Sequence, residues 1–338
     1  MYHSWLDRWD ERRALRGDLS KRATDFVLDT ERAFPHQAKM PGLEEFCFLA
    51  DHALADPTFF DEPNASGQGF HIQDGWLKFP SDMSTDVEEN NIVWAKITES
   101  GSFDRVMVVF HHWNATARNY QIANFFAQRG ITVVEIAMPY HFERSRPGSM
   151  YADFMLSPNL GRTIQSLRQA VWDGRKLIRW LKSVGYREIY VFGMSLGSWV
   201  AGLIAAHDVA VSKASLFLTG GSLADMVWTG RATRSIRASL EPAIDLSDLR
   251  RAWNPINLEN YARGLARTDL EIHVVLAKRD KVVLPEISQQ FMQMLKSAGA
   301  KPNSLELNCG HYSLGKAPYI LFAGLSLKRF LFGRPALA

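Results

Sequence analysis

Three side chains, in the chain order serine, aspartate and histidine, have the chemistry of a nucleophilic catalytic set. Ser195 lies in the segment GMSLG, which matches the pattern G-x-S-x-G. Asp280 lies in AKRDKVVLP, and His311 lies in NCGHYSLG. A serine hydroxyl becomes a good nucleophile when a base takes its proton and a carboxylate orients that base. The three residues therefore predict acyl-transfer chemistry if the fold brings them together.

The segment around Ser195 predicts a sharp turn from a strand into a helix. Residues 189–192 are apolar and rich in β-branched and aromatic side chains, which indicates a buried strand, and residues 199–206 read as an apolar helix. Glycines at positions 193 and 197 allow neighbouring backbone to approach closely, so the serine can adopt a strained, exposed conformation. The N–H groups of the new helix would point towards developing negative charge.

Asp280 and His311 each follow a predicted strand. Residues 270–277 precede the aspartate, and residues 304–307 precede the histidine. In an α/β architecture the loops at the carboxyl ends of the strands carry the site, so both residues are expected on the same edge of the sheet as Ser195.

Strands and helices alternate along most of the chain. Further buried strands are predicted at 105–110, 131–137 and 214–218, with helices at 120–129, 160–184, 285–298 and 318–332. A strand pair over 69–79, turning at Asp74 and Gly75, and a strand at 91–98 come before them. The alternation predicts an α/β fold, with a mostly parallel sheet covered by helices on both faces.

Two segments lie outside this alternation. Residues 1–65 are expected to form a helical and irregular extension that covers the sheet or mediates contacts in a homo-oligomer, with residues 66–338 as the main domain. One helical face would carry Trp5, Trp9 and Leu15, and a second helix would run from Ala23 to Ala33. We predict no chemistry in this extension. Residues 220–268 form a mostly helical insertion, which we expect to be a cap over the site.

Composition narrows the classes of partner. The 338 residues carry a net charge of only +3 and no long basic run, which argues against a nucleic-acid partner. Cys47 and Cys309 provide neither a disulfide framework nor metal-ligand spacing. The sequence shows no secretory signal and no apolar run of the roughly 18 residues that a transmembrane helix needs. We therefore expect a cytoplasmic protein that requires no metal and no cofactor.

From residue 105 to residue 332 the chain resembles the α/β-hydrolase superfamily. GMSLG is similar to its nucleophile elbow, RDKVVLP to its acid loop and GHYSL to its histidine loop. This resemblance implies that Ser195 is the nucleophile, His311 the general acid and base, and Asp280 the residue that orients the histidine. MPYHFERSRP, a long helix ending WLKSVGY, and GMSLG together resemble the family of α/β-hydrolase domain-containing protein 18.

The resemblance also implies an oxyanion hole and substrate contacts. HHWNA after the strand at 105–110 resembles the family's oxyanion loop, so the backbone N–H groups of Trp113 and Leu196 would hold the oxyanion. His112 stands where the family usually has glycine. Other residues are expected to contact substrate. They are His112, Met194, and the cap residues Met226 and Trp228.

Other assignments remain open at the level of sequence. Met226 and Trp228 could belong to the insertion's own core, together with Leu240, Leu246, Leu249 and Trp253. Arg231, Arg234 and Arg237 would lie along one side of a helix, where they meet an anionic substrate or face solvent.

Each triad position also has rival interpretations. Asp280 could instead be a surface acid paired with Arg279 or Lys281, and Asp225 or Asp245 could replace it as the triad acid. His311 could be a structural turn residue, and His112 could replace it as the base. Cys309 could be the nucleophile, and His111, His112 and His311 could bind a metal.

Two functional hypotheses follow. The first is a serine hydrolase that cleaves a carboxylic ester of a small-molecule or lipid-like substrate through an acyl-enzyme. Thioester or amide cleavage and acyl transfer use the same residues. The second is a non-catalytic α/β-hydrolase scaffold that binds a small molecule or a partner, since a fold alone does not fix a function.

Overall fold

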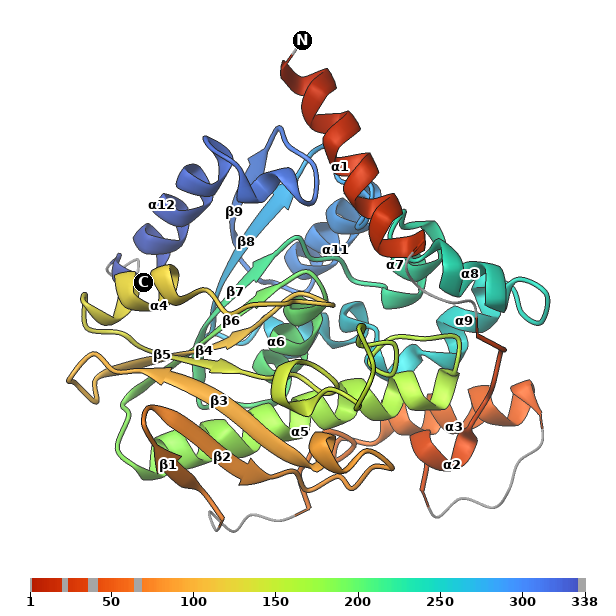
Figure 1. Cartoon of the computed structure of the whole chain (residues 1–338), viewed down its shortest axis with the longest axis horizontal. Coiled ribbons are helices and arrows are strands. Elements are labelled where there is room, and N and C mark those ends of the chain that lie inside the picture. The colour runs from red at the N-terminus through yellow and green to blue at the C-terminus, as the bar shows by residue number, and fades with distance from the viewer. Residues whose placement is uncertain (1, 20–23, 36–41, 64–68, 334–338) are drawn as a thin grey trace.

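The computed structural model describes residues 2–19, 24–35, 42–63 and 69–333. A sheet of nine strands runs through the described part of the chain, in the order β1-β2-β3-β5-β4-β6-β7-β8-β9 (Figure 1). The strands are β1 (His71–Gln73), β2 (Trp76–Pro80), β3 (Ile92–Thr98), β4 (Arg105–Phe110), β5 (Thr132–Ile136), β6 (Glu188–Met194), β7 (Val211–Phe217), β8 (Glu271–Ala277) and β9 (Asn303–Leu307).

The sheet is mostly parallel. The six strands from β5 to β9 in this order pair in parallel, whereas β1, β2 and β3 form antiparallel pairs and join the sheet antiparallel to β5. The prediction of an α/β fold with a mostly parallel sheet is therefore confirmed. The central strand β5 is buried along its whole length, which explains its mostly apolar sequence.

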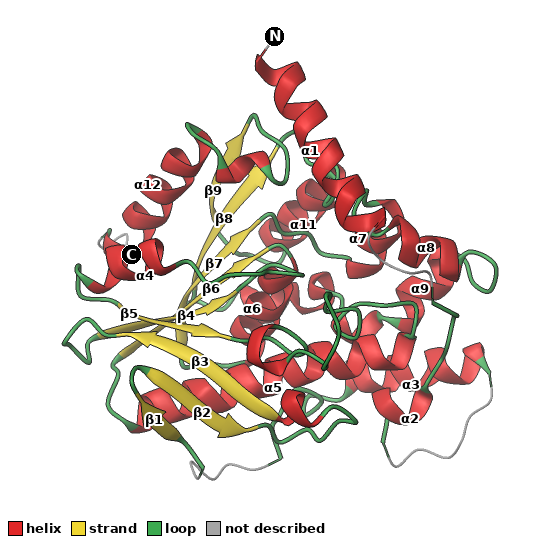
Figure 2. Cartoon of the chain, viewed as in Figure 1, coloured by secondary structure: helices red, strands yellow, loops and turns green. Residues whose placement is uncertain are grey.

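Helices cover both faces of the sheet (Figure 2). One face packs against α5 (Leu160–Ser183), α6 (Leu196–His207) and α11 (Pro285–Ser297), which share the larger hydrophobic core. The other face packs against α4 (Tyr120–Ala127) and α12 (Tyr319–Phe332). Residues 319–327, which are too short to span a membrane, lie in α12, and no helix in the described ranges is long and apolar enough to cross a bilayer.

The insertion between β7 and β8 is helical, as predicted. Its elements are α7 (Leu223–Thr229), α8 (Arg234–Leu240), α9 (Leu246–Ala252) and α10 (Ala262–Leu265), with the short 3-10 turns Asn254–Ile256 and Leu258–Tyr261. Leu240, Leu249 and Trp253 are fully buried and belong to the larger core. The apolar residues of the insertion thus fasten it to the main domain.

The N-terminal segment differs in detail from its prediction. Helix α1 (Tyr2–Leu19) forms, but its buried positions are Leu6, Asp10, Ala14 and Asp18. The expected apolar face is wrong, since Trp5 is half exposed. The buried face includes two carboxylates, Asp10 and Asp18, so it is not the apolar stripe that predicts the buried face of a helix.

The rest of the extension is also less helical than expected. The helix predicted from Ala23 to Ala33 is present only as α2 (Thr30–Ala33), and Ala23 lies outside the described residues. Val27 instead forms a bridge with Asn159, and its carbonyl accepts a bond from the Leu160 N–H. A further helix, α3 (Leu43–Ala55), contributes Phe46 and Leu49 to the larger core.

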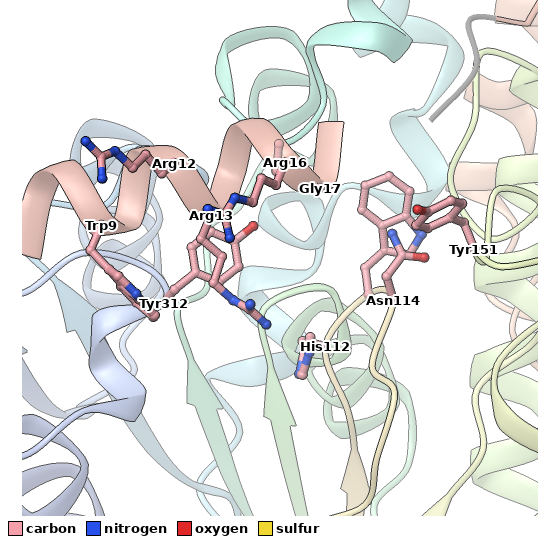
Figure 3. Close-up of a pocket in the computed structure, with 11 residues that line it drawn as sticks. Trp9, Arg12, Arg13, Arg16, Gly17, His112, Asn114, Tyr151 and Tyr312 are labelled. Atoms are coloured by element: carbon pink, nitrogen blue, oxygen red, sulfur yellow. The ribbon is translucent and has the colours of Figure 1, made fainter. Parts of the chain in front are cut away.

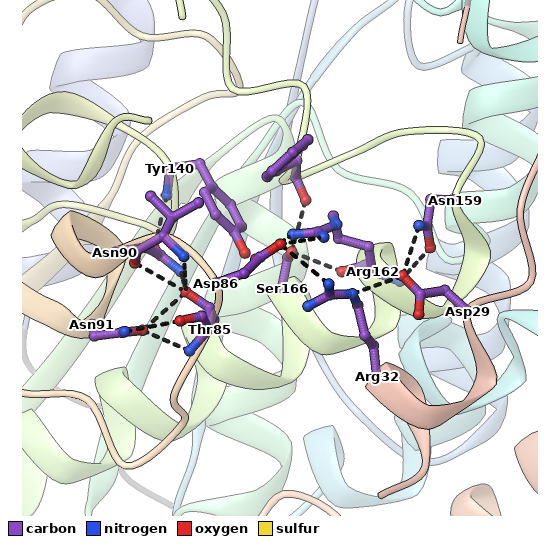
Figure 4. A network of polar contacts seen from close by, with 12 residues as sticks. Asp29, Arg32, Thr85, Asp86, Asn90, Asn91, Tyr140, Asn159, Arg162 and Ser166 are labelled. Carbon is purple, nitrogen blue, oxygen red and sulfur yellow. Dashed lines mark hydrogen bonds and ion pairs between the residues drawn. The ribbon is translucent and has the colours of Figure 1, made fainter. Parts of the chain in front are cut away.

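Helix α5 is fixed by polar contacts as well as by apolar packing. Arg162 forms a two-bond ion pair with Asp86, which also pairs with Arg32, as Figure 4 shows. Further along the helix, Arg144 and Asp173 form an ion pair of 2.9 Å between fully buried side chains. The Arg144 guanidinium also donates to the carbonyls of Asn90 and Ala137. These bonds hold the loop after β5 against α5.

We expect Asp173→Ala to lower the free energy of unfolding by about 3–5 kcal/mol, because the Arg144 guanidinium would stay buried without its carboxylate. Urea unfolding measures this loss. The exposed pair of Arg237 and Glu241 provides the control, and Glu241→Ala should cost less than about 1 kcal/mol. Equal losses in the two variants would contradict the prediction.

Candidate active site

Ser195 lies at a strained turn between β6 and α6. Its backbone has φ 53° and ψ −126°, a conformation that is costly for a residue with a side chain. The neighbouring glycines permit the turn. A Cβ at Gly193 would lie 2.2 Å from the Gly197 carbonyl oxygen, and a Cβ at Gly197 would lie 2.3 Å from the Phe110 carbonyl oxygen. Only glycine fits at both positions, as the sequence pattern indicates.

The three predicted triad side chains lie in one hydrogen-bonded chain. His311 Nδ1 is 2.7 Å from Asp280 Oδ2, and His311 Nε2 is 3.1 Å from Ser195 Oγ. The aspartate and histidine are buried, and the serine is partly exposed. With Nδ1–H donating to the carboxylate, Nε2 faces the serine as a proton acceptor, which is the arrangement that general-base catalysis requires.

The second oxygen of Asp280 fixes its loop. Asp280 Oδ1 accepts bonds from the backbone N–H groups of Val282 and Val283, at 2.7 and 2.9 Å. The neighbouring cations turn elsewhere, because Arg279 pairs with Asp7 and Lys281 with Glu11. The carboxylate is thus held for the histidine and does not belong to a surface ion pair.

The loop after β4 lies beside the nucleophile. Gly197 packs directly on the carbonyls of Phe110 and His111, so the start of α6 touches the start of this loop. Asn114 has φ 56° and uses its side chain to accept a bond from the Ala152 N–H. The indole of Trp113 donates to the Ala152 carbonyl. These bonds fix the backbone at the position where an oxyanion loop is expected.

The buried His141 and the partly buried His111 brace this loop against the loop after β5. His111 Nε2 accepts a bond from the Met138 N–H, and its Nδ1 donates to the His112 carbonyl. His141 Nε2 accepts from the Asn114 N–H, and its Nδ1 donates to the Pro139 carbonyl. Each ring must be neutral to accept at Nε2, and burial lowers the pKa of both, to about 4 for His141.

His112 points away from these braces. Its side chain is exposed to solvent at the cavity, yet protein atoms surround the ring closely enough that desolvation, with the nearby His311 and Arg13, lowers its pKa to about 4. It has no hydrogen bond to Ser195, whereas His311 does. The geometry therefore favours His311 as the base and leaves His112 as a neutral wall residue.

Helix α1 holds the histidine loop. Asp10 Oδ1 accepts bonds from the backbone N–H groups of Tyr312 and Ser313, at 2.7 and 3.0 Å, immediately after the catalytic histidine candidate. Asp10 is itself buried. Asp7 and Glu11 on the same helix pair with the two cations that flank Asp280. One face of α1 therefore contacts both the acid loop and the histidine loop of the triad. No chemistry was predicted for this helix from the sequence. The spacing of its acidic residues Asp7, Asp10 and Glu11, three and four apart, could have indicated a carboxylate face that docks on the domain.

A cavity of about 450 Å³ opens under α1, next to the loop that carries His112. Figure 3 shows α1 crossing above His112, with Arg13 between them and Tyr151 on the far side. Arg12 and Arg16 also line the cavity. The charges of α1 are therefore segregated, with carboxylates towards the domain and guanidinium groups towards the cavity.

The two cap residues that were predicted to contact substrate lie in different surroundings. Met226 is buried in the larger core, and Trp228 lines a separate pocket with Arg231, Arg234 and Arg237. Neither cap residue lines the cavity under α1, and their contact with substrate stays a prediction. Met194, in contrast, is partly exposed beside Ser195.

The rival catalytic residues have other roles. Asp225 pairs with Arg250, and Asp245 caps α9. Cys309 is buried, and burial raises the pKa of its thiol to about 12, so it is a poor nucleophile. Among the described residues, no cluster of three or more side chains has the geometry of a metal site.

The chain shares its fold with solved α/β-hydrolase structures. An acetyl xylan esterase from Paenibacillus sp. R4 has a TM-score of 0.60 and 14% identity, over 89% of this chain and 97% of its own. Acetyl xylan esterase 1 from Thermoanaerobacterium sp. JW/SL YS485 has a TM-score of 0.57 and 15% identity, over 91% of this chain and 99% of its own. The acylaminoacyl peptidase of Pyrococcus horikoshii has a TM-score of 0.58 and 11% identity, over 80% of this chain and 43% of its own.

No protein-family model matches the chain, and no curated protein matches it in sequence. The likeness to these structures establishes the α/β-hydrolase fold. The narrower resemblance to the family of α/β-hydrolase domain-containing protein 18 stays a prediction.

We expect Asp10→Ala to lower kcat about 10- to 100-fold on any substrate that the triad turns over, because the histidine loop loses two anchoring bonds. Asp10→Asn keeps an acceptor and should restore most of the rate. Asp18→Ala is the control. Asp18 also docks α1, through Ser235, but does not touch the histidine loop. A similar loss of kcat in Asp18→Ala would contradict a positioning role for Asp10.

The neutral His141 makes stability depend on pH. Its folded pKa of about 4 lies below the ordinary value of 6.5, so between these values the unfolded chain binds a proton that the folded protein does not. This contribution to stability is lost as pH falls from 6.5 to 4. His141→Gln removes the titrating ring and should make the fall in Tm over this range shallower. Calorimetry checks this, with His52→Gln on α3 as the control, and parallel curves for wild type and His141→Gln would contradict it.

Proposed function

We propose that the protein is a serine hydrolase that cleaves a carboxylic ester through an acyl-enzyme intermediate. The observation that carries the proposal is the hydrogen-bonded chain from Asp280 through His311 to Ser195, ending at a strained and accessible hydroxyl. The structural neighbours named as esterases support the ester as the substrate bond. The peptidase among them has the same fold, and amide cleavage would use the same three residues.

In the proposed first half-reaction, Ser195 Oγ attacks the ester carbonyl carbon and its proton moves to His311 Nε2. The carbonyl oxygen takes the electron pair and becomes an oxyanion. When the oxyanion collapses, the carbon–oxygen bond to the alcohol breaks, and the leaving oxygen takes the proton from His311. The products of this step are the free alcohol and an acyl group on Ser195.

The second half-reaction uses water in place of the alcohol. His311 takes a proton from water, the hydroxyl attacks the acyl carbon, and the acid leaves as Ser195 regains its proton from His311. Asp280 stabilises the imidazolium that forms twice in each turnover. A thioester would acylate Ser195 by the same first half-reaction. An acceptor other than water would take the acyl group by the same second half-reaction.

We assign the oxyanion to the backbone N–H groups of Leu196 and Trp113. Leu196 is the first residue of the twelve-residue helix α6, so its N–H lies at the positive end of the helix dipole. Trp113 lies in the loop braced by His111 and His141, where the backbone is fixed before substrate binds. His112 replaces the usual glycine, and its side chain turns outward to line the cavity under α1 instead of entering this hole.

The test is hydrolysis of p-nitrophenyl esters from acetate to palmitate. We expect Ser195→Ala to lower kcat by about 10⁴-fold or more, since the nucleophile is lost. Asp280→Asn should lower kcat by about 10⁴-fold, because the amide cannot hold the same histidine tautomer. Cys309→Ala is the control and should retain activity.

Labelling by a fluorophosphonate provides a second measurement, because this reagent requires an activated serine. Wild type should be labelled and Ser195→Ala should not. If the wild-type protein neither hydrolyses these esters nor is labelled under conditions that label a control hydrolase, the non-catalytic scaffold becomes the better account.

A further inference from the structure

A second cavity lies on the face of the sheet that α4 and α12 cover. Its volume is about 480 Å³, within the usual range for small-molecule sites. The floor consists of side chains on β4, β6 and β7, namely Met107, Val109, Phe192, Met194 and Phe217. The walls consist of residues from the two helices, including Ile122, Phe125, Phe126, Leu321, Leu325 and Leu327. The two helices thus leave a strip of the sheet uncovered between them.

The inner end of this cavity lies at residues that adjoin the nucleophile and the oxyanion loop in the chain. Met194, the last residue of β6, lines the cavity and directly precedes Ser195. His112 lines this cavity and also the one under α1, so the two cavities meet at this side chain. His112 belongs to the loop that is proposed to hold the oxyanion, so the end of the α4–α12 cavity at Met194 and His112 is the end that faces the proposed site.

The chemistry of the lining changes along the cavity. Its polar residues include His111, His112, Arg118 and Glu135, on or beside the loops at the carboxyl edge of the sheet. His111 is neutral, and Arg118 is already occupied by a two-bond ion pair with Glu143. Farther along α12 the lining is apolar, and Leu321 and Leu325 remain more than half exposed. A lining that is polar at the carboxyl edge of the sheet and apolar from there to an exposed apolar rim fits an ester group followed by an unbranched hydrocarbon chain.

Gly324 marks the open part of this cavity. It lies in the middle of α12 and lines the cavity, and a Cβ built there would meet no atom within 4 Å. The position does not require glycine for its backbone, since its φ is not positive. A side chain at this position would therefore occupy space that is empty in the structure.

We propose that the α4–α12 cavity binds the acyl chain of a medium- to long-chain ester, with the carbonyl at Ser195. This inference rests on the proposed hydrolase function and adds the substrate class. The apolar residues of the insertion, by contrast, are packed in the core, so the acyl site lies on the opposite side of the sheet from α6. The continuity of the cavity with Met194 distinguishes an acyl chain from a partner helix, which would need only the outer rim.

The experiment compares kcat/KM for p-nitrophenyl acetate, octanoate and dodecanoate in wild type and Gly324→Leu. In wild type, kcat/KM should rise about fourfold for each methylene that is buried. In Gly324→Leu, hydrolysis of acetate should stay within about twofold of wild type, while dodecanoate hydrolysis falls at least about tenfold. Leucine is a better helix former than glycine, so the variant should remain folded.

Arg329→Leu is the matched control, because it adds a leucine to the same helix at an exposed position outside the cavity. It should keep the wild-type chain-length profile. An unchanged profile in Gly324→Leu would overturn the proposal. If, in addition, Gly324→Leu and wild type differ in oligomeric state by sedimentation, the surface is a contact between subunits.

A binding measurement separates this inference from the proposed function. The Ser195→Ala variant should bind a dansylated undecanoic acid, and the dansyl fluorescence should increase on binding. Adding Gly324→Leu to this variant should abolish the increase, and adding Arg329→Leu should preserve it. If no ester is hydrolysed but this binding is seen, the hydrolase proposal fails and the chain-binding cavity stands. If acetate is hydrolysed through Ser195 but the fatty acid does not bind, the acyl site is wrong and the hydrolase proposal stands.

Discussion

The close backbone approach at Gly197 is the constraint on which the rest of the site depends. The absence of a side chain there lets the first turn of α6 rest on the carbonyls of Phe110 and His111. The ends of β4 and β6 are already paired in the sheet, and this contact adds the start of α6, so the oxyanion loop and Ser195 cannot move independently. A single methyl group at this position would push α6 away from the loop, and the hydroxyl would lose its place opposite His311.

Local patterns were sufficient to predict the centre of the fold. The strands β4, β5 and β8 and the helix α5 appear close to their predicted bounds, because buried parallel strands and long amphipathic helices leave strong periodic signals. The residues Ser195, Asp280 and His311 could also be named, since each follows a strand whose end lies at one edge of the sheet. The contacts among them are properties of the structure that no spacing could supply.

Other features depend on contacts between distant segments, which one sequence does not reveal. The docked face of α1 was mispredicted because its buried positions include Asp10 and Asp18, which find partners more than two hundred residues away. Met226 could be given either a core position or a substrate contact, because apolar residues of a core and of a cavity look alike in sequence. The bracing roles of His111 and His141 were not predicted, because each depends on a hydrogen bond between the loop after β4 and the loop after β5.

The long separation between α1 and the histidine loop has a consequence for the order of folding. Asp10 and Tyr312 are 302 residues apart, so ribosomal synthesis produces the helix long before its anchor exists. Contacts of such separation form late, after the intervening chain has already lost much of its freedom. A nascent chain that has completed the sheet as far as β8 would therefore hold its nucleophile without its base, and the reactive hydroxyl would stay unactivated until the final loop is in place.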